Sequence, residues 1–97
     1  MSYQLLLTPE FQSWFEKLDP KTQLIITSRL ERLQIEGHWG FVNRFDNLIE
    51  LKWTSGIRVY TSLKQNNILV LLGGNKNGQS KDIKKAQKLL AKYIEEV

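Results

Sequence analysis

The chain contains no cysteine and only one histidine, His38, among its 97 residues. Without cysteine, a disulfide framework and a thiolate metal site are both excluded. A zinc site with a single histidine would need several carboxylate ligands, so we expect neither a metal nor a cofactor. No apolar run approaches the roughly 20 residues needed to span a bilayer, and the first residues lack the basic and apolar regions of a signal peptide. We therefore expect a cytoplasmic protein with no membrane partner.

Positive charge is unevenly placed along the chain, which at this length we expect to form one domain over residues 1–97. The formal net charge is +4. Residues 1–75 contain eight Lys/Arg and seven Asp/Glu, whereas residues 76–97 contain six Lys and three Asp/Glu, so most of the excess lies in the last segment. Such a cluster suits a polyanion or an acidic partner protein, although a solvated helix face would show the same pattern.

Capping signals and helical periodicity predict three helices. Thr8-Pro9 and Asp19-Pro20 each place proline at the first helical position after a good N-cap, and Gly37 is a natural stop for the second helix. We expect these first two helices to form an antiparallel pair joined by a tight corner. The apolar residues at helical spacing are Phe11, Trp14, Phe15 and Leu18, then Ile26, Leu30 and Leu33, and finally Ile83, Ala86, Leu90, Tyr93 and Val97.

Between residues 48 and 72 the period changes to that of β-strands. Residues 48–54 and 57–63 alternate apolar and polar side chains, which predicts two strands with one core face and one polar face. Residues 67–72 are apolar, as expected of a central strand covered on both sides. Residues 3–8 indicate a first strand, and residues 41–45 could add another. The predicted order is β-α-α-β-β-β-α, an α+β fold with an antiparallel sheet packed against helices.

The loop Thr54-Ser55-Gly56 sets the register of the predicted hairpin. A three-residue connection with glycine in the left-handed position is common between antiparallel strands. It pairs Trp53 with Ile57 and Leu51 with Val59, so core residues meet core residues. A two-residue loop would mix the two faces, and we therefore reject it.

The same register gathers polar side chains on the other face of the hairpin. Lys52 lies opposite Arg58, and Glu50 lies opposite Tyr60. Like charges directly opposite one another destabilise a sheet by about 0.2–1 kcal/mol, so the pair indicates that an anion binds there. Two alternatives stay open. Both cations could extend into water, or Glu50 could neutralise Arg58.

A glycine-containing segment, residues 73–79, follows the last predicted strand. Pairing of that strand places Arg58 near residues 73–75, so Lys76 should project over the same face. The glycines would let a ligand approach the backbone closely, although an ordinary turn would contain them equally well. With Lys52 and Tyr60, these residues describe a cationic patch that carries one aromatic hydroxyl and suits RNA phosphate and ribose.

Several motifs, in one order along nearly the whole chain, resemble the addiction-module killer branch of the RelE/ParE superfamily, a branch similar to HigB and RelE. The most diagnostic segment is Gly73-Gly74-Asn75-Lys76 with Gln79 and Asp82-Ile83 after it. The other motifs are residues 11–19, residues 29–33, Ile49-Glu50-Leu51-Lys52 and Ile57-Arg58-Val59-Tyr60. The resemblance implies a RelE-like fold and the toxin of a type II toxin–antitoxin system.

The resemblance also implies a chemistry. Such toxins enter the ribosomal A site and cleave mRNA, with the ribose 2′-hydroxyl attacking the adjacent phosphate without a metal. Arg58 then matches the arginine that stabilises the scissile phosphate, while Lys76, Lys52 and Glu50 match basic and polar positions of the catalytic site. RNA or ribosome binding is assigned to the lysine-rich segment, at Lys81, Lys84, Lys85, Lys88 and Gln79.

The acid or base of the reaction departs from the family pattern. Many members place a tyrosine or histidine late in the chain, but here Tyr93 falls on the apolar face of the last helix and no late histidine exists. Tyr60 is the substitute that the register offers. The implied partners are the ribosome, mRNA and a cognate helix-turn-helix antitoxin in a toxin–antitoxin hetero-oligomer. A ParE-like inhibitor of DNA gyrase and a degenerate module that only binds an antitoxin are the alternatives.

Overall fold

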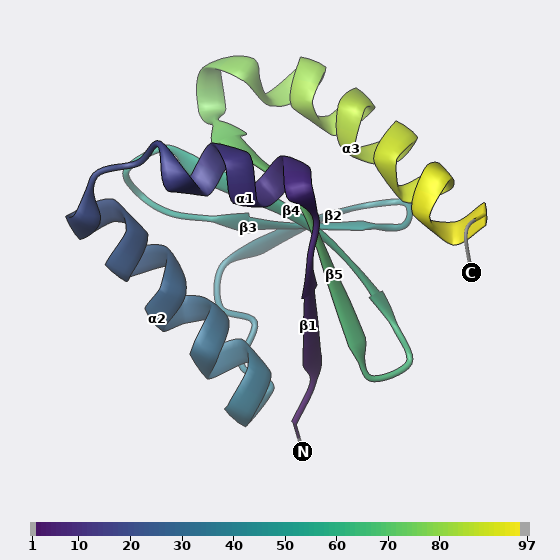
Figure 1. Cartoon of the computed structure of the whole chain (residues 1–97), viewed down its shortest axis with the longest axis horizontal. Helices are drawn as coiled ribbons and strands as arrows, with labels where there is room; N and C mark the ends of the chain where they lie inside the picture. Colours follow the sequence, from purple (N-terminus) through teal and green to yellow (C-terminus); the bar gives the residue numbers. More distant parts are fainter. Residues whose placement is uncertain (1, 96–97) are drawn as a thin grey trace.

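A five-stranded sheet with helices on both faces forms the framework of the molecule (Figure 1). The computed structural model describes residues 2–95. Within that range, none of the helices is both long and apolar enough to cross a membrane. The elements are β1 (Gln4–Leu7), α1 (Pro9–Glu16), α2 (Pro20–Glu36), β2 (Val42–Phe45), β3 (Leu48–Lys52), β4 (Ile57–Lys64), β5 (Asn67–Asn75), a short 3₁₀ turn η1 (Lys76–Gly78) and α3 (Gln79–Glu95).

The strand order in the sheet is β1-β5-β4-β3-β2. The antiparallel meander is confirmed. The possible strand at residues 41–45 is present as β2, which pairs with β3. β1 joins β5 in parallel, a pairing that the sequence did not specify. This parallel pair needs a long crossover between its strands, and the two helices and the meander supply it.

The predicted starts of α1 and α2 and the stop at Gly37 are confirmed, whereas α1 ends at Glu16, before the predicted Leu18. The Thr8 hydroxyl accepts the Phe11 N–H at 3.0 Å and donates to the Leu71 carbonyl at 2.7 Å, which ties the start of α1 to β5. The Asp19 carboxylate accepts the Thr22 N–H, and Gly37 ends α2 with a φ of 71°. Each cap satisfies helix-end groups that would otherwise lack a partner.

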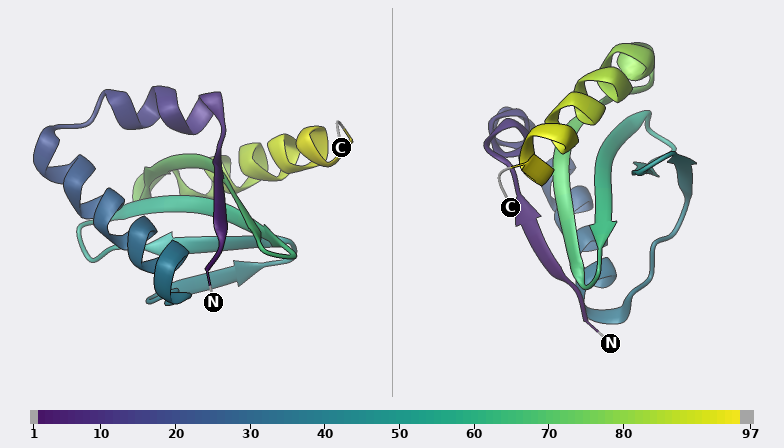
Figure 2. Two further views of the ribbon diagram at one scale, coloured as in Figure 1. Left: turned by 60° about the horizontal axis from the view of Figure 1, so that its bottom comes forward. Right: turned by 90° about the vertical axis from the view of Figure 1, so that its right-hand side faces the viewer.

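The first two helices diverge from their corner instead of lying side by side (Figures 1 and 2). The prediction of an antiparallel pair is wrong in this respect, because each helix packs its own apolar residues on the sheet. A cleft of about 560 Å³ opens between them and is lined by residues such as Phe15 and Leu30.

Two apolar clusters flank the sheet. One joins α1 and α2 to the sheet through Phe11, Ile26, Leu30, Leu33, Leu51, Val59, Ile68 and Val70. The other lies under α3 and contains Leu48, Tyr60, Leu71, Leu72, Ala86 and Leu90. The apolar stripe predicted for the last helix is confirmed from Ile83 to Tyr93, and Val97 lies outside the described residues.

The second cluster overturns one expectation about the hairpin. β3 and β4 were predicted to have one core face and one polar face, but α3 covers much of the polar face, and Glu50 and Tyr60 are both 0% exposed. The physical reason is that the apolar stripe of α3 needs a partner, and the meander offers the aromatic ring of Tyr60 there. An irregularity in register after Tyr60 lets Leu71 and Leu72 both join this side.

Candidate nucleic-acid interface

The hairpin between β3 and β4 has the predicted register. Lys52 is paired with Arg58 and Glu50 with Tyr60. At the loop, the Trp53 N–H donates to the Ile57 carbonyl at 3.1 Å. Gly56 has a φ of 102°, in the region that favours glycine. The three-residue connection is therefore confirmed.

Cross-strand pairing places the polar side chains of this face in two neighbouring rows. The row that we call the inner row consists of Asn43, Glu50, Tyr60 and Leu72, on β2, β3, β4 and β5 respectively. The row that we call the outer row lies one step further along the strands and consists of Phe41, Lys52, Arg58 and Gly74. Phe41 belongs to it because its carbonyl accepts the Lys52 N–H at 3.0 Å.

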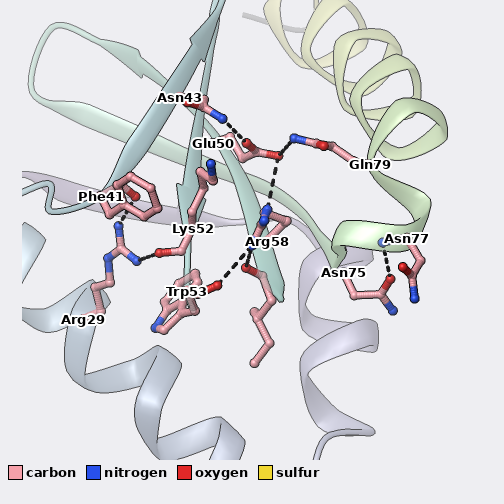
Figure 3. A network of polar contacts seen from close by, with 11 residues as sticks. Arg29, Phe41, Asn43, Glu50, Lys52, Trp53, Arg58, Asn75, Asn77 and Gln79 are labelled. Atoms are coloured by element: carbon pink, nitrogen blue, oxygen red, sulfur yellow. Dashed lines mark hydrogen bonds and ion pairs between the residues drawn. The ribbon is translucent and has the colours of Figure 1, made fainter. Parts of the chain in front are cut away.

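Glu50 is the centre of the inner row and has polar partners on three elements (Figure 3). Its Oε1 accepts from Asn43 Nδ2 at 3.1 Å, and its Oε2 accepts from Gln79 Nε2 at 2.8 Å. Arg58 Nε lies 3.9 Å from the same Oε2. A buried carboxylate is tolerated only with such partners, so the three donors explain how Glu50 can lie inside the fold.

Tyr60 is also enclosed. Its hydroxyl is buried and forms no hydrogen bond with any of residues 2–95. Burial, and then the nearby Glu50 carboxylate, raise the pKa of the Tyr60 hydroxyl well above its ordinary value. A side chain in this position has no path to exchange a proton with RNA, which removes the reason for taking Tyr60 as the substitute acid or base.

Arg58 links the two rows. Its Nη1 donates to the backbone carbonyls of Trp53 at 3.1 Å and Ile57 at 3.0 Å, while its Nε faces Glu50. No hydrogen bond or ion pair within residues 2–95 engages Nη2, and this atom is not enclosed, although only 12% of the side chain is exposed. The guanidinium is thus fixed on two sides and keeps one nitrogen for a ligand. The Glu50 carboxylate thus forms an ion pair with Arg58, which is one of the two alternatives that the sequence left open.

Lys52 and Phe41 continue the outer row toward β2. Lys52 Nζ lies 4.6 Å from the centre of the Phe41 ring, within the range of a cation–π contact. Arg29 of α2 holds this segment from below. Its guanidinium donates to the carbonyls of Phe41 at 2.6 Å, Trp39 at 3.1 Å and Lys52, and it lies 4.4 Å from the Trp53 ring. The backbone that carries Phe41 and Lys52 is therefore anchored to the core.

The two glycines of β5 make room for side chains of the protein itself. A Cβ on Gly73 would lie 2.1 Å from the Trp14 ring, and a Cβ on Gly74 would lie 2.1 Å from the Asp82 carboxylate. Burial raises the pKa of Asp82, and the Lys85 and Lys81 ammonium groups partly offset this. The packing of Trp14 and Asp82 is therefore enough to explain why glycine occupies these two positions, without a ligand close to the backbone.

The lysine-rich segment has the exposure that the sequence predicted. Lys76 is exposed at the turn after β5, where its backbone N–H donates to the Gly56 carbonyl at 2.8 Å. Gln79 differs from the other members, because its amide is bound to Glu50 inside the fold. Tyr93 is half-buried, and its hydroxyl donates to Glu10 at 3.1 Å. The exposed lysines along α3 are Lys81, Lys84, Lys85, Lys88 and Lys92.

Sequence reasoning missed Arg29, Asn43 and Phe41. Asn43 could have been found by extending the hairpin register to the next strand, since it pairs with Glu50. Arg29 has no such signal, because it reaches the hairpin from a helix more than twenty residues earlier. Among residues 2–95, no group of three or more His, Cys, Asp or Glu side chains could hold a metal ion.

The architecture matches solved toxin structures. A mutant of the Escherichia coli toxin RelE in the free state superposes with a TM-score of 0.70, covers 97% of this chain and 99% of its own, and is 14% identical. A chain of the RelBE2 toxin–antitoxin complex of Mycobacterium tuberculosis gives 0.63 at 14% identity, over 77% of this chain and 99% of its own. A chain of the intact E. coli RelBE complex gives 0.61 at 16% identity, over 76% of this chain and 96% of its own.

These likenesses define the class: the chain has the RelE-like fold, as its motifs predicted. It is also 41% identical to an uncharacterized protein of Haemophilus influenzae, over 97% of this chain and 98% of that protein. The chain therefore belongs to the same family as the H. influenzae protein. No model of a known protein family matches it.

Proposed function

We propose that this protein is the toxin of a type II toxin–antitoxin pair and that it cleaves mRNA on the ribosome. Support comes from the RelE-like fold and from one observation in particular. Arg58 is held by two carbonyls and a buried carboxylate, keeps Nη2 available, and lies directly opposite Lys52. Two cations kept side by side on a sheet suit a phosphodiester, because an anion removes their mutual repulsion.

The proposed reaction is transesterification without a metal. The ribose 2′-oxygen attacks the adjacent phosphorus, the bond to the 5′-oxygen of the next nucleotide breaks, and a cyclic phosphate forms. Arg58 stabilises the negative charge that develops on the phosphate oxygens. Lys52 and Lys76 bind the flanking backbone as cations. In the proposed reaction the proton of the 2′-hydroxyl passes to solvent water, and an ammonium group of one of these lysines donates a proton to the leaving 5′-oxygen. Glu50 acts through Arg58 and does not touch the RNA, because it is fully buried.

We also propose an antitoxin that forms a hetero-oligomer with this chain. RelBE structures of two organisms pair the same fold with an antitoxin. The lysines along α3 and the Arg58–Lys76 side suit an acidic segment of such a partner. A complex purified with the product of the adjacent reading frame should cover one of these two surfaces, and a complex in which both stay exposed to solvent would contradict the assignment.

Growth arrest with RNA mapping tests the proposed activity. Expression of the unaltered chain should stop growth and leave mRNA cut within the ribosomal A site. The double variant Arg58→Glu with Lys76→Glu should do neither. The control is Lys21→Glu with Lys64→Glu, which makes the same change in charge at exposed positions away from the rows and should remain toxic.

Each other outcome points to a different function. If the double variant at residues 58 and 76 still arrests growth, the nuclease proposal fails. Accumulation of cleaved gyrase–DNA complexes would identify a ParE-like gyrase inhibitor instead. An unaltered chain that has no effect on growth yet binds its antitoxin would be a degenerate module.

A further inference from the structure

We propose that Phe41 is a stacking platform for an RNA base, placed so that Lys52 and Arg58 bind the phosphate backbone beside it. This inference rests on the proposed function, since it names how the same surface would hold single-stranded RNA. It adds a binding residue that neither the charge pattern nor the motifs indicated.

The exposure of the Phe41 ring is the first observation. Phe41 is 63% exposed, and it is the one aromatic residue among the large hydrophobic side chains exposed within residues 2–95, the others being leucine and isoleucine. Single exposed apolar residues are ordinary and carry no function by themselves. The surroundings of this ring are what distinguish it.

The backbone that carries the ring is held in place. The Phe41 carbonyl accepts from both Arg29 Nη2 and the Lys52 N–H. Arg29 is itself fixed over the Trp53 ring. An aromatic side chain on an anchored backbone loses little conformational freedom when a planar ligand stacks on it.

The position of Phe41 in the outer row is the third observation. Neighbouring strands are about 4.8 Å apart, so the backbones at Phe41 and Arg58, two strands apart, are separated by about 10 Å. Lys52 lies between them, with its ammonium group near the ring (Figure 3). A nucleotide could therefore place its base on the ring while its phosphates lie against the two cations.

This combination favours single-stranded RNA over a protein segment. Exposed aromatic rings next to basic groups bind unpaired bases in a way that tolerates different sequences. The one carboxylate of these two rows, Glu50, is buried and has three partners, so it does not repel a phosphate at the surface. An apolar protein partner would gain nothing from the cations that flank the ring.

The test uses the full-length protein and a short single-stranded RNA that carries 2-aminopurine and 2′-O-methyl riboses, which cannot be cleaved. Stacking on the ring should quench the 2-aminopurine fluorescence. We expect Phe41→Tyr to bind and quench like the wild type, and Phe41→Leu to lose the quenching and bind about tenfold more weakly. Lys52→Gln should bind more weakly with a reduced dependence of affinity on salt. Ile35→Ala, which alters an equally exposed apolar residue on α2, should change neither quantity.

The outcomes separate this inference from the proposed function. Loss of binding and quenching in Phe41→Leu supports the platform even if no cleavage is found in cells, in which case only the nuclease proposal fails. Unchanged quenching in Phe41→Leu overturns the platform, whatever the cleavage results. A wild type that does not bind the RNA overturns it as well, and so does a Phe41→Leu protein that loses only its capture by the antitoxin.

Discussion

The inner and outer rows lie next to each other on the same face of the sheet, yet their side chains have different environments. Glu50 and Tyr60 are fully buried beneath α3, whereas Phe41 is largely exposed and Arg58 Nη2 has no partner among residues 2–95. The boundary between the rows is the start of α3, because Gln79 reaches back to Glu50 from its first turn. The inner row is thus enclosed by α3, whereas part of the outer row reaches the surface.

The largest effect should follow from changing the outer row at Arg58. We expect Arg58→Gln to lower the rate of mRNA cleavage on the ribosome about 100- to 1000-fold, since a group that stabilises developing charge contributes on that scale. Single-turnover cleavage measures it. Arg32→Gln is the matched control, because Arg32 is a surface arginine that pairs with the exposed Glu36 in the next turn. A loss of less than about fivefold in Arg58→Gln would remove the distinction between the rows.

The next effect concerns the inner row at Glu50. Glu50→Ala should lower the free energy of unfolding by about 3 kcal/mol, because it leaves Asn43, Gln79 and the buried Nε of Arg58 without their shared acceptor. Urea unfolding measures the change. Glu50→Gln should cost less, since one acceptor oxygen remains. Glu31→Ala at an exposed position is the control. Equal stability of Glu50→Ala and this control would show that the inner row is not a structural unit.

Gln79 gives a sharper comparison, because the sequence pattern placed it among RNA-binding residues. Gln79→Ala should lower the free energy of unfolding by about 1.5 kcal/mol, the contribution of a hydrogen bond to a charged group. The salt dependence of RNA binding should stay the same. Gln87→Ala, at an exposed position of the same helix, serves as the reference. A stable Gln79→Ala protein with weaker RNA binding would show that Gln79 contributes to RNA binding and not to stability.

The smallest effect at neutral pH is expected for Tyr60→Phe, which removes a buried hydroxyl that has no geometric partner within residues 2–95. A difference appears in alkali. The folded protein holds the Tyr60 proton more tightly than the unfolded chain does, because the pKa is raised on folding, so wild-type stability should fall as the pH rises above the ordinary value of 10.0. Urea unfolding across this range should show a smaller fall for Tyr60→Phe. Equal falls, or a loss of RNA cleavage in Tyr60→Phe at neutral pH, would contradict the burial of this hydroxyl.

Local signals in the sequence were enough for much of the fold. The two cap-proline pairs set the starts of α1 and α2, and the three-residue loop set the pairing of Lys52 with Arg58. These features depend on residues close together in the chain, where propensity and periodicity act directly. The parallel pairing of β1 with β5 has no local signal, because it joins residues about sixty positions apart.

The burial of Glu50 and Tyr60 could not be predicted for a related reason. Alternation in β3 and β4 separates two faces but does not tell which face a distant helix will cover. The apolar stripe of α3 was predicted correctly, but the surface of the sheet on which it packs was not. The contact between Arg29 and the Phe41 carbonyl could not be predicted either, because a side chain that bridges two distant elements produces no periodic pattern in the sequence.

One measurement addresses most directly the claim that RNA contacts the outer row. Isotope-labelled protein would be titrated with the non-cleavable RNA and followed by NMR at the backbone amides and at the arginine and lysine side chains. The signals of Phe41, Lys52 and Arg58 should shift together with one saturation curve, while those of the outer side of α2, such as Leu24 and Ile35, should stay in place. Shifts confined to α2, or to the lysines of α3 with Arg58 and Phe41 unaffected, would contradict the account.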